Sequence, residues 1–279
     1  LQSKVWRNWI VAYTCIPRRY YRNKIMFSDK VIAEIKAHAR SEYPKESCGL
    51  VINGGYFACT NTAEDPYKDF TIDNGTYIDA VNLWLDAVVH SHPDGKRCPS
   101  GNDMRSQIAM DVTWGILVVT KEIESDIIWW GGDIPTPPLL GRSFVHGITD
   151  CYALIRDYHK LERGIILPDW PRDIEWWNKN QDLYMDNFAE QGFEMVHGGT
   201  PEIGDTCLCR LFSSVNNHAG VYVGGGLMLH HLQNRISCHE PVYRWMNHIS
   251  TWLRYTRKSE NLAVGLQQLQ TTSQSLDHE

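Results

Sequence analysis

Apolar residues in the first half of the chain follow two periods, one typical of helices and one typical of strands. A helix is predicted between Ser28, which can cap it, and the Tyr43-Pro44 break, on apolar residues at helical spacing: Val31, Ile32, Ile35 and Ala39. Short apolar runs predict strands at 48–52, 56–59, 84–92, 114–120 and 126–130, and Asn53-Gly54-Gly55 predicts a hairpin between the first two. A helix carrying Tyr77, Ile78, Val81 and Leu85 is predicted before the third strand. These elements predict an α/β unit.

The second half of the chain carries its own order of helix and strand. A helix is predicted from Cys151 to a stop at Gly164, on residues at helical spacing: Cys151, Leu154, Ile155, Tyr158 and Leu161. A strand at 218–223, a glycine turn at 224–226 and a returning strand at 227–230 predict a hairpin. Between the Cys151 helix and the hairpin, another helix is predicted to carry five aromatic residues: Trp170, Trp176, Trp177, Tyr184 and Phe188. Most of them are expected to pack in the core and one or two to line a substrate groove, with nothing in the sequence to choose among them. The fold class is therefore predicted as α+β, with two domains.

The domain boundaries follow from breaks in these periods. Glycines and prolines interrupt all periodicity from 131 to 138, so a linker is placed at 133–140, between domains at 25–132 and 141–255. Residues 1–24 are predicted to be an extension of unknown role. Their apolar run has the basic neighbours of a signal peptide, but its core is short and Tyr13-Thr14 lacks the small residues of a cleavage site. Residues 256–279 are predicted to be a mobile polar tail.

Composition narrows the class of protein. A length of 279 residues suits two domains of ordinary size. The formal net charge of −6, with its charges interspersed, offers no basic face for a phosphate backbone and so argues against a nucleic-acid partner. No apolar run is long enough to span a membrane. The 8 cysteines are dispersed and form no C-x-x-C pair, which favours reduced thiols over a disulfide framework.

One short stretch gathers side chains with the spacing of a metal site. His90 and His92 end a predicted strand, so both point to the same face. Ser100 and Asp103 have the S-x-x-D pattern of a helix start, which returns a carboxylate toward the histidines. Two imidazoles, one carboxylate and an open fourth position are typical of catalytic zinc. Non-heme iron uses the same ligand types, so the ligands by themselves leave the metal open.

A second candidate site lies in the second half. Cys151 begins a predicted helix, where the helix terminus favours the thiolate and free amides can stabilise an oxyanion. His218 on the following hairpin is the candidate base. A three-residue turn at 224–226 places Gly220 opposite His230, which then lies diagonally from His218 and can orient it. A two-residue turn shifts the register by one and places His231 there instead, so both alternatives stay open.

The first stretch resembles the JAMM (Mov34/MPN) metallopeptidase motif, on the residues His90-x-His92-Pro93 and Ser100-x-x-Asp103, with Glu46 upstream. The resemblance implies one zinc ion on His90, His92 and Asp103, and a water as the nucleophile. It also implies Glu46 as general base and Ser100 as an aid to the oxyanion.

Residues 150–230 are similar to the NlpC/P60 cysteine peptidases, a family with a papain-like α+β domain. The similarity rests on these motifs: Asp150-Cys151, Gly204-Asp205, His218-Ala219-Gly220-Val221-Tyr222 and His230. Tyr152 departs from the pattern, because many relatives carry a small residue or tryptophan there. The resemblance implies a Cys151–His218–His230 triad.

The order of the two domains, over about residues 27 to 255, resembles that of the tail tip assembly proteins of lambda-like bacteriophages. The resemblance implies a tail-associated peptidoglycan endopeptidase that cuts amide bonds of stem peptides and acts during tail assembly or genome entry. It implies peptidoglycan stem peptides and other phage tail-tip proteins as partners. It also implies a location in the phage tail or virion, after synthesis in the host bacterial cytoplasm.

Several alternatives stay open at this point. A host cell-wall remodelling hydrolase is the rival enzyme, favoured if residues 1–24 act as an export signal. A structural tail-tip protein with inactive peptidase domains is the rival from another class. The sequence leaves open the substrate of the zinc domain, whether both sites are active, the stem-peptide bond that is cut and the oligomeric state.

Overall fold

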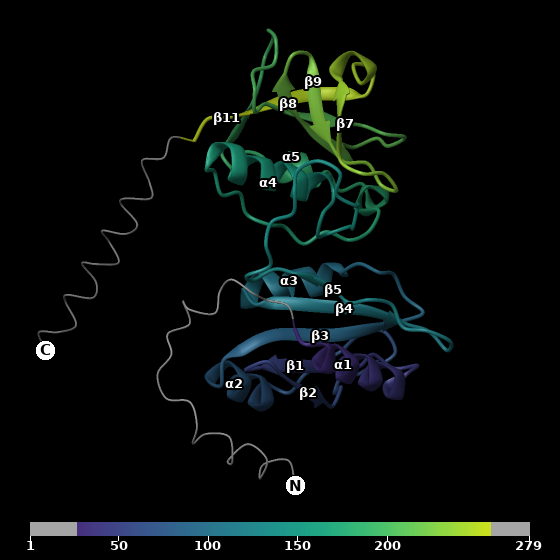
Figure 1. Ribbon diagram of the computed structural model, residues 1–279. Coiled ribbons are helices and arrows are strands. Elements are labelled where there is room, and N and C mark those ends of the chain that lie inside the picture. Colours follow the sequence, from purple (N-terminus) through teal and green to yellow (C-terminus); the bar gives the residue numbers. More distant parts are fainter. Residues whose placement is uncertain (1–26, 258–279) are drawn as a thin grey trace, which may run out of the picture. The chain divides into compact units, whose positions relative to one another are not determined.

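The computed structural model describes residues 27–257, which fold as two compact units (Figure 1). The chain passes from the first unit to the second after Pro135. Residues 100–104 group with the second unit, although the helix at 101–110 connects two strands of the first unit. The predictions for residues 1–24, and for all but the first two residues of the polar tail, lie outside the described residues.

The first unit is a mixed five-stranded sheet with three helices. Its strands lie in the order β2-β1-β3-β4-β5, and β3 and β4 are its parallel pair, connected through α3. The elements in chain order are α1 (Asp29–Glu42), β1 (Cys48–Ile52), β2 (Gly55–Cys59), α2 (Asn74–Asn82), β3 (Leu85–Pro93), α3 (Gly101–Met110), β4 (Thr113–Val119) and β5 (Ile128–Trp130).

Local chemistry explains where these elements begin and end. The Ser28 hydroxyl accepts a hydrogen bond from the Val31 amide and caps α1. The β1–β2 hairpin turns through Asn53 and Gly54, both with positive φ, as a two-residue hairpin loop requires. The prediction of a helix reaching Leu85 is wrong: α2 ends at Asn82, and Leu85 begins β3. Trp84 has a φ of 69°, a conformation that a helix cannot continue through.

The core of the first unit determines which face of the sheet carries the histidines. Apolar side chains of α1 pack against one face of the sheet. The strand residues in this contact are Val51, Ala87, Val89 and Leu117. Successive side chains of a strand point to opposite faces. Because Val89 points toward α1, His90 points to the opposite face, and His92 follows it two residues later.

The second unit is an antiparallel six-stranded sheet with α4 packed against it (Figure 1). The strands lie in the order β10-β9-β8-β7-β11-β6. The elements in chain order are α4 (Cys151–Arg163), the 3-10 helix η4 (Trp176–Lys179), α5 (Leu183–Asn187), β6 (Phe193–Met195), β7 (Thr206–Cys209), β8 (His218–Gly224), β9 (Leu227–His230), β10 (Cys238–Pro241), the 3-10 helix η5 (Val242–Arg244) and β11 (Ile249–Tyr255).

Helix α4 begins and ends as predicted. The Asp150 carboxylate accepts a hydrogen bond of 2.9 Å from the Ala153 amide, and Gly164 ends the helix with a φ of 65°. The apolar face of α4 packs on the sheet in one core with Leu208, Ala219, Val221 and Leu229. Burial of this face holds the helix against β8, so Cys151, its first residue, has a defined position beside that strand.

The prediction of one aromatic-rich helix between α4 and β6 is wrong. Only η4 and α5 form there, and Trp170 lies in neither. Glu175 and Asn180 take positive φ values of 54° and 56°, which stop a right-handed helix on either side of η4. The expectation of core packing holds for Trp176, which is 4% exposed.

The fold class is the predicted α+β arrangement of two domains. Within residues 27–257 the cysteines are all free thiols, as predicted. Over the same residues, the search for a helix with the length and apolar character of a membrane span finds none.

Candidate active sites

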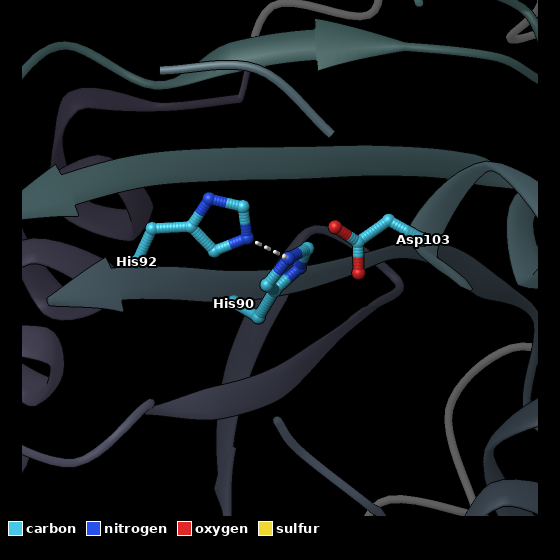
Figure 2. Close-up of side chains that lie close together, drawn as sticks. All are labelled: His90, His92 and Asp103. Atoms are coloured by element: carbon cyan, nitrogen blue, oxygen red, sulfur yellow. Dashed lines mark hydrogen bonds between the residues drawn. The ribbon is translucent and has the colours of Figure 1, made fainter. Parts of the chain in front are cut away.

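His90, His92 and Asp103 meet on the face of the first sheet opposite α1 (Figure 2). The Nε2 atoms of His90 and His92 lie 3.1 Å apart. Asp103 reaches them from the first turn of α3, with its carboxylate turned toward the His90 ring. One potential ligand atom from each residue lies within 4.8 Å of the other two. The structure thus brings together the three side chains that the sequence predicted as metal ligands.

Neighbouring groups orient both rings. The Lys96 carbonyl oxygen lies 2.9 Å from His92 Nδ1, and a carbonyl can only accept a hydrogen bond. Nδ1 therefore carries the proton, and Nε2 presents its lone pair to the group, as in many metal sites. The His90 ring stacks on Phe70 at a centroid distance of 4.5 Å, which restricts the orientation of the imidazole.

Ser100 and Asp103 form a reciprocal cap at the start of α3. The Ser100 amide donates to Asp103 Oδ2 at 2.7 Å, and the Asp103 amide donates to Ser100 Oγ at 3.1 Å. The hydrogen bond from the Ser100 amide occupies one carboxylate oxygen of Asp103 and orients the carboxylate. Ser100 thus positions a ligand, and its predicted part in stabilising an oxyanion stays a prediction.

Glu46 lies directly before β1 and is 6% exposed. In the β1–β3 pairing Cys48 faces His90, and the Ser47 amide donates to Ser91 Oγ at 2.9 Å. Continuing this antiparallel register by two residues places Glu46 opposite His92, on the face of the metal group. This position suits the predicted general base, and that role stays a prediction.

The donor set fits a divalent transition metal. Two imidazoles and one carboxylate are borderline ligands that suit zinc, and three protein ligands leave a position for substrate or water. The 3.1 Å between the two imidazole nitrogens is close to the ligand spacing around a four-coordinate zinc ion, and Asp103 offers an oxygen within 4.8 Å of a nitrogen of each ring.

In the second unit Cys151 lies where α4 meets the start of β8. Its Sγ atom is 3.2 Å from the Tyr184 hydroxyl, and the backbone amide of Ala219 hydrogen-bonds the sulfur. Ala219 directly follows His218, so the thiol and the predicted base come from adjoining ends of α4 and β8. Tyr184, from α5, was not predicted as a site residue, because nothing in the sequence distinguishes it from the core aromatics around it.

Burial and the Asp150 carboxylate raise the pKa of the Cys151 thiol to about 11, although the Tyr184 hydroxyl and the Ala219 amide act to lower it. The Cys151 thiol is therefore protonated at pH 7, and the predicted effect of the helix terminus does not outweigh burial. A helix terminus contributes about 0.3–1 kcal/mol at exposed positions. That contribution lowers a pKa by less than about one unit, and burial outweighs it.

The β8–β9 hairpin has the register that was predicted for a three-residue turn, although its turn has only two residues. Gly220 pairs with His230, but the strands are joined by two residues, after Gly224 and before Leu227. The additional residue is Val223, which forms a bulge between Tyr222 and Gly224 and has no partner on β9 in the register. The bulge thereby keeps His230, and not His231, opposite Gly220.

His218 Nε2 lies 3.2 Å from His230 Nδ1, and both rings are buried. His231 points elsewhere, with its Nε2 atom 3.1 Å from the Arg235 carbonyl oxygen. His230 is therefore the histidine in a position to orient His218. Burial lowers the pKa of both His218 and His230, so both imidazoles are neutral at pH 7 and His218 can accept a proton.

A buried ion pair holds the start of α4. Arg172 donates from Nε to Asp150 Oδ2 at 2.7 Å and from Nη2 to Asp150 Oδ1 at 3.0 Å. Burial by itself raises the pKa of the Asp150 carboxyl, but the charge and hydrogen bonds of Arg172 hold it well below its usual range. Sequence reasoning missed Arg172, since no local pattern links residues 22 positions apart.

Alkylation of Cys151 by iodoacetamide is expected to accelerate about tenfold per pH unit from pH 7 to pH 10, since only the thiolate reacts and its pKa is about 11. Tyr184→Phe should slow the reaction at each pH, because it removes a hydrogen bond that lowers this pKa. Mass analysis of the Cys151 peptide gives the rates. A plateau below pH 8 contradicts the prediction.

Two family models match the chain, one over each unit. The model described as prokaryotic homologs of the JAB domain matches residues 28–130, and the NlpC/P60 family model matches residues 129–254. The chain is also 18% identical to an NlpC/P60 family protein from Bacillus cereus of known crystal structure, over 47% of this chain and 45% of that one, with a TM-score of 0.31.

Two curated proteins are similar to this chain in sequence. The tail tip assembly protein K of Escherichia phage N15 is 34% identical over 226 residues, which cover 76% of this chain and 88% of that protein. The tail tip assembly protein K of Escherichia phage lambda is 39% identical over 154 residues, which cover 55% of this chain and 73% of that protein.

Proposed function

Because the chain belongs to the family of phage tail tip assembly proteins K, with a JAB-like domain followed by an NlpC/P60 peptidase domain, we propose that it cleaves stem-peptide amide bonds of peptidoglycan through Cys151, His218 and His230. The observation that carries this proposal is the His218–His230 contact of 3.2 Å beside the start of α4. The proposed setting is the phage tail tip, with other tail-tip proteins as partners. The similarity to two phage proteins favours this setting over host cell-wall remodelling.

The hydrogen bond between the two histidines determines which atom acts as base. The Glu240 carboxylate lies 3.9 Å from His230 Nε2 and favours the proton on that nitrogen, so we assign His230 Nδ1 as the acceptor and His218 Nε2–H as the donor. His218 Nδ1 then keeps a lone pair for the Cys151 proton. Both groups are neutral at rest, so the proton moves as Cys151 Sγ attacks the substrate carbonyl. His230 stabilises the imidazolium that forms, and His218 then returns the proton to the leaving amine.

Donors for the developing oxyanion lie at the start of α4. The Ala153 amide is used by the Asp150 cap, which leaves the amides of Cys151 and Tyr152 in the first turn. The Tyr184 hydroxyl, beside the sulfur, is a third donor. In the second half-reaction His218 takes a proton from water, which hydrolyses the thioester and frees Cys151.

The first unit carries a second proposed peptidase site. His90, His92 and Asp103 hold a zinc ion in this proposal, and bound zinc supplies a Lewis acid for amide hydrolysis. Glu46 takes the proton from the attacking water, and Ser100 holds the Asp103 carboxylate in place. Its substrate is proposed to be a peptide or isopeptide bond, in the cell wall or in a tail protein.

Digestion of purified peptidoglycan with the reduced protein tests the proposal. Mass analysis should reveal stem peptides cut at one amide bond, such as the bond from D-glutamate to diaminopimelate. Release should stop after iodoacetamide treatment and persist with EDTA, because the cysteine site needs no metal. If reduced protein releases no fragment, the alternative of a structural tail-tip protein with inactive domains holds.

His92→Ala is expected to remove one bound metal ion per chain, because it deletes one of three ligands. Elemental analysis of the purified proteins gives both the amount and the metal, and so decides between zinc and iron. His197→Ala, at an exposed histidine, is the matched control and should keep the wild-type content. Equal metal content in His92→Ala and wild type contradicts the ligand set.

A further inference from the structure

A second group of side chains that could hold a metal ion lies on β9 and β10. His230 Nε2 is 3.8 Å from Cys238 Sγ and 3.9 Å from the Glu240 carboxylate. One atom from each of the three residues lies within 4.8 Å of the other two. Around a tetrahedral zinc ion, such atoms are about 3.4–3.6 Å apart. Adjustments of a few tenths of an ångström therefore bring the Cys238 and Glu240 ligand atoms to this distance from His230 Nε2.

The sheet itself imposes this arrangement. In the β9–β10 pairing Cys238 lies opposite His230 and Glu240 lies opposite Met228. Because strand residues alternate between faces, Cys238 and Glu240 share the face of His230. Strand β10 is the edge of the sheet, and Cys238 and Glu240 are partly exposed. An ion from solvent can thus reach a group whose backbone is already in place.

Two neighbouring side chains, Trp245 and Arg235, contact the Glu240 carboxylate. Trp245 Nε1 donates to Glu240 Oε2 at 2.9 Å, and the Trp245 ring lies 4.6 Å from the His230 ring, centroid to centroid. Arg235 Nη1 lies 3.9 Å from Glu240 Oε1, but its side chain is 67% exposed. Arg235 can turn into solvent when a cation takes its place, whereas the buried Trp245 continues to hold the carboxylate.

We propose that His230, Cys238 and Glu240 bind a zinc-like divalent cation, and that this cation switches off the cysteine site. An imidazole, a thiolate and a carboxylate suit Zn²⁺ and Co²⁺, with water in the fourth position. The metal site stands on its own geometry. The switch rests on the proposed peptidase function.

The switch follows from the two nitrogens of His230. Without a metal, the Glu240 carboxylate favours the ring proton of His230 on Nε2, and Nδ1 accepts the hydrogen bond assigned to His218 Nε2–H. A metal on Nε2 takes that lone pair, so the proton of the neutral ring must sit on Nδ1. His230 then donates to His218 Nε2. His218 is left with its proton on Nδ1, where it cannot accept one from Cys151.

The protons balance in this step. The proton of His218 Nε2 passes to His230 Nδ1 across their hydrogen bond. The proton displaced from His230 Nε2 is replaced, through water, by one on His218 Nδ1, so the two rings together keep two protons. Cys238 releases one proton to solvent when its thiolate binds the metal.

Cobalt binding to the full-length His92→Ala protein tests the site, since this background lacks a ligand of the first metal group. One Co²⁺ per chain should bind with a thiolate-to-cobalt charge-transfer band. Adding Cys238→Ser should abolish the band and weaken binding by about 10- to 100-fold or more. Cys59→Ser, a partly exposed thiol of the first unit, should change neither. A band that persists in Cys238→Ser, as binding at Cys151 predicts, overturns the site.

Stem-peptide release by the same proteins tests the switch. Zn²⁺ should inhibit the His92→Ala protein reversibly with EDTA, and Cys238→Ser should keep the basal rate but need about tenfold or more Zn²⁺ for equal inhibition. Equal inhibition of both overturns the switch. If the cobalt band is present but no fragment is released even without metal, the proposed function and the switch fail while the metal site stands.

Nitrogen-15 NMR of the histidine rings reports the tautomer of His218. Zn²⁺ that inhibits by binding elsewhere leaves this tautomer unchanged. With Zn²⁺, His218 Nδ1 should change from the unprotonated to the protonated signal, and Cys238→Ser should suppress the change. A His218 tautomer that is the same with and without bound metal overturns the proposed mechanism of the switch.

Discussion

Cys151→Ala is expected to lower the rate of stem-peptide release by about 10⁴-fold or more. Without the thiol no thioester forms, and His218 has no proton to accept. The remaining donors at the start of α4 still bind substrate and account for any residual rate. Initial rates of fragment release, measured with EDTA present, isolate this site from the proposed metal site.

Two controls separate lost chemistry from lost fold. Cys59→Ser removes a partly exposed thiol from the first unit and should keep the full rate. Cys151→Ser preserves the size of the side chain with a poorer nucleophile and should fall near the alanine variant. A Cys151→Ala protein that releases the same fragments within tenfold of the wild-type rate refutes the assignment of the nucleophile.

Arg172→Met is expected to lower the free energy of unfolding of the second unit by roughly 3–5 kcal/mol. The substitution leaves the Asp150 carboxylate 2% exposed without its charged partner. Asp150 also caps α4, so the start of the helix loosens at Cys151. Hydrogen exchange of α4 amides reports this free energy for the second unit by itself.

A double variant tests the cause. Asp150→Asn in the Arg172→Met background removes the buried charge, so the combined loss should be smaller than the sum of the two single losses. Lys179→Met breaks an ion pair with Asp173 in which both side chains are more than half exposed, and should cost only about 0–1 kcal/mol. A loss as small for Arg172→Met as for Lys179→Met contradicts the prediction.

The sequence predicted elements well where short-range chemistry decides them. The Ser28 cap, the start of α4 at Cys151, the Gly164 stop and the Asn53-Gly54 turn all depend on chemistry within a few residues, and each is found where it was predicted. The alternation of strand side chains was enough to bring His90 and His92 together. The reciprocal cap of Ser100 and Asp103 was likewise visible as a local pattern.

Prediction failed where distant contacts compete with local preference. The aromatic segment between α4 and β6 reads as one helix, yet Glu175 and Asn180 adopt positive φ and divide it. The Cys151 thiol reads as an activated group, but burial outweighs the helix terminus. Both outcomes depend on what packs around a residue, and that environment is set by other parts of the chain.

The sequence by itself determined the ligand types of the metal group, the caps of the helices and the place of Cys151 at a helix start, since these follow from residue chemistry and spacing of a few positions. Only the tertiary structure decided that Tyr184 lies beside Cys151, that Arg172 pairs with Asp150 and that Cys238 faces His230. A bulge kept His230 in register where a simple two-residue turn places His231. Such contacts join residues far apart in the chain, and burial of the common core brings them together.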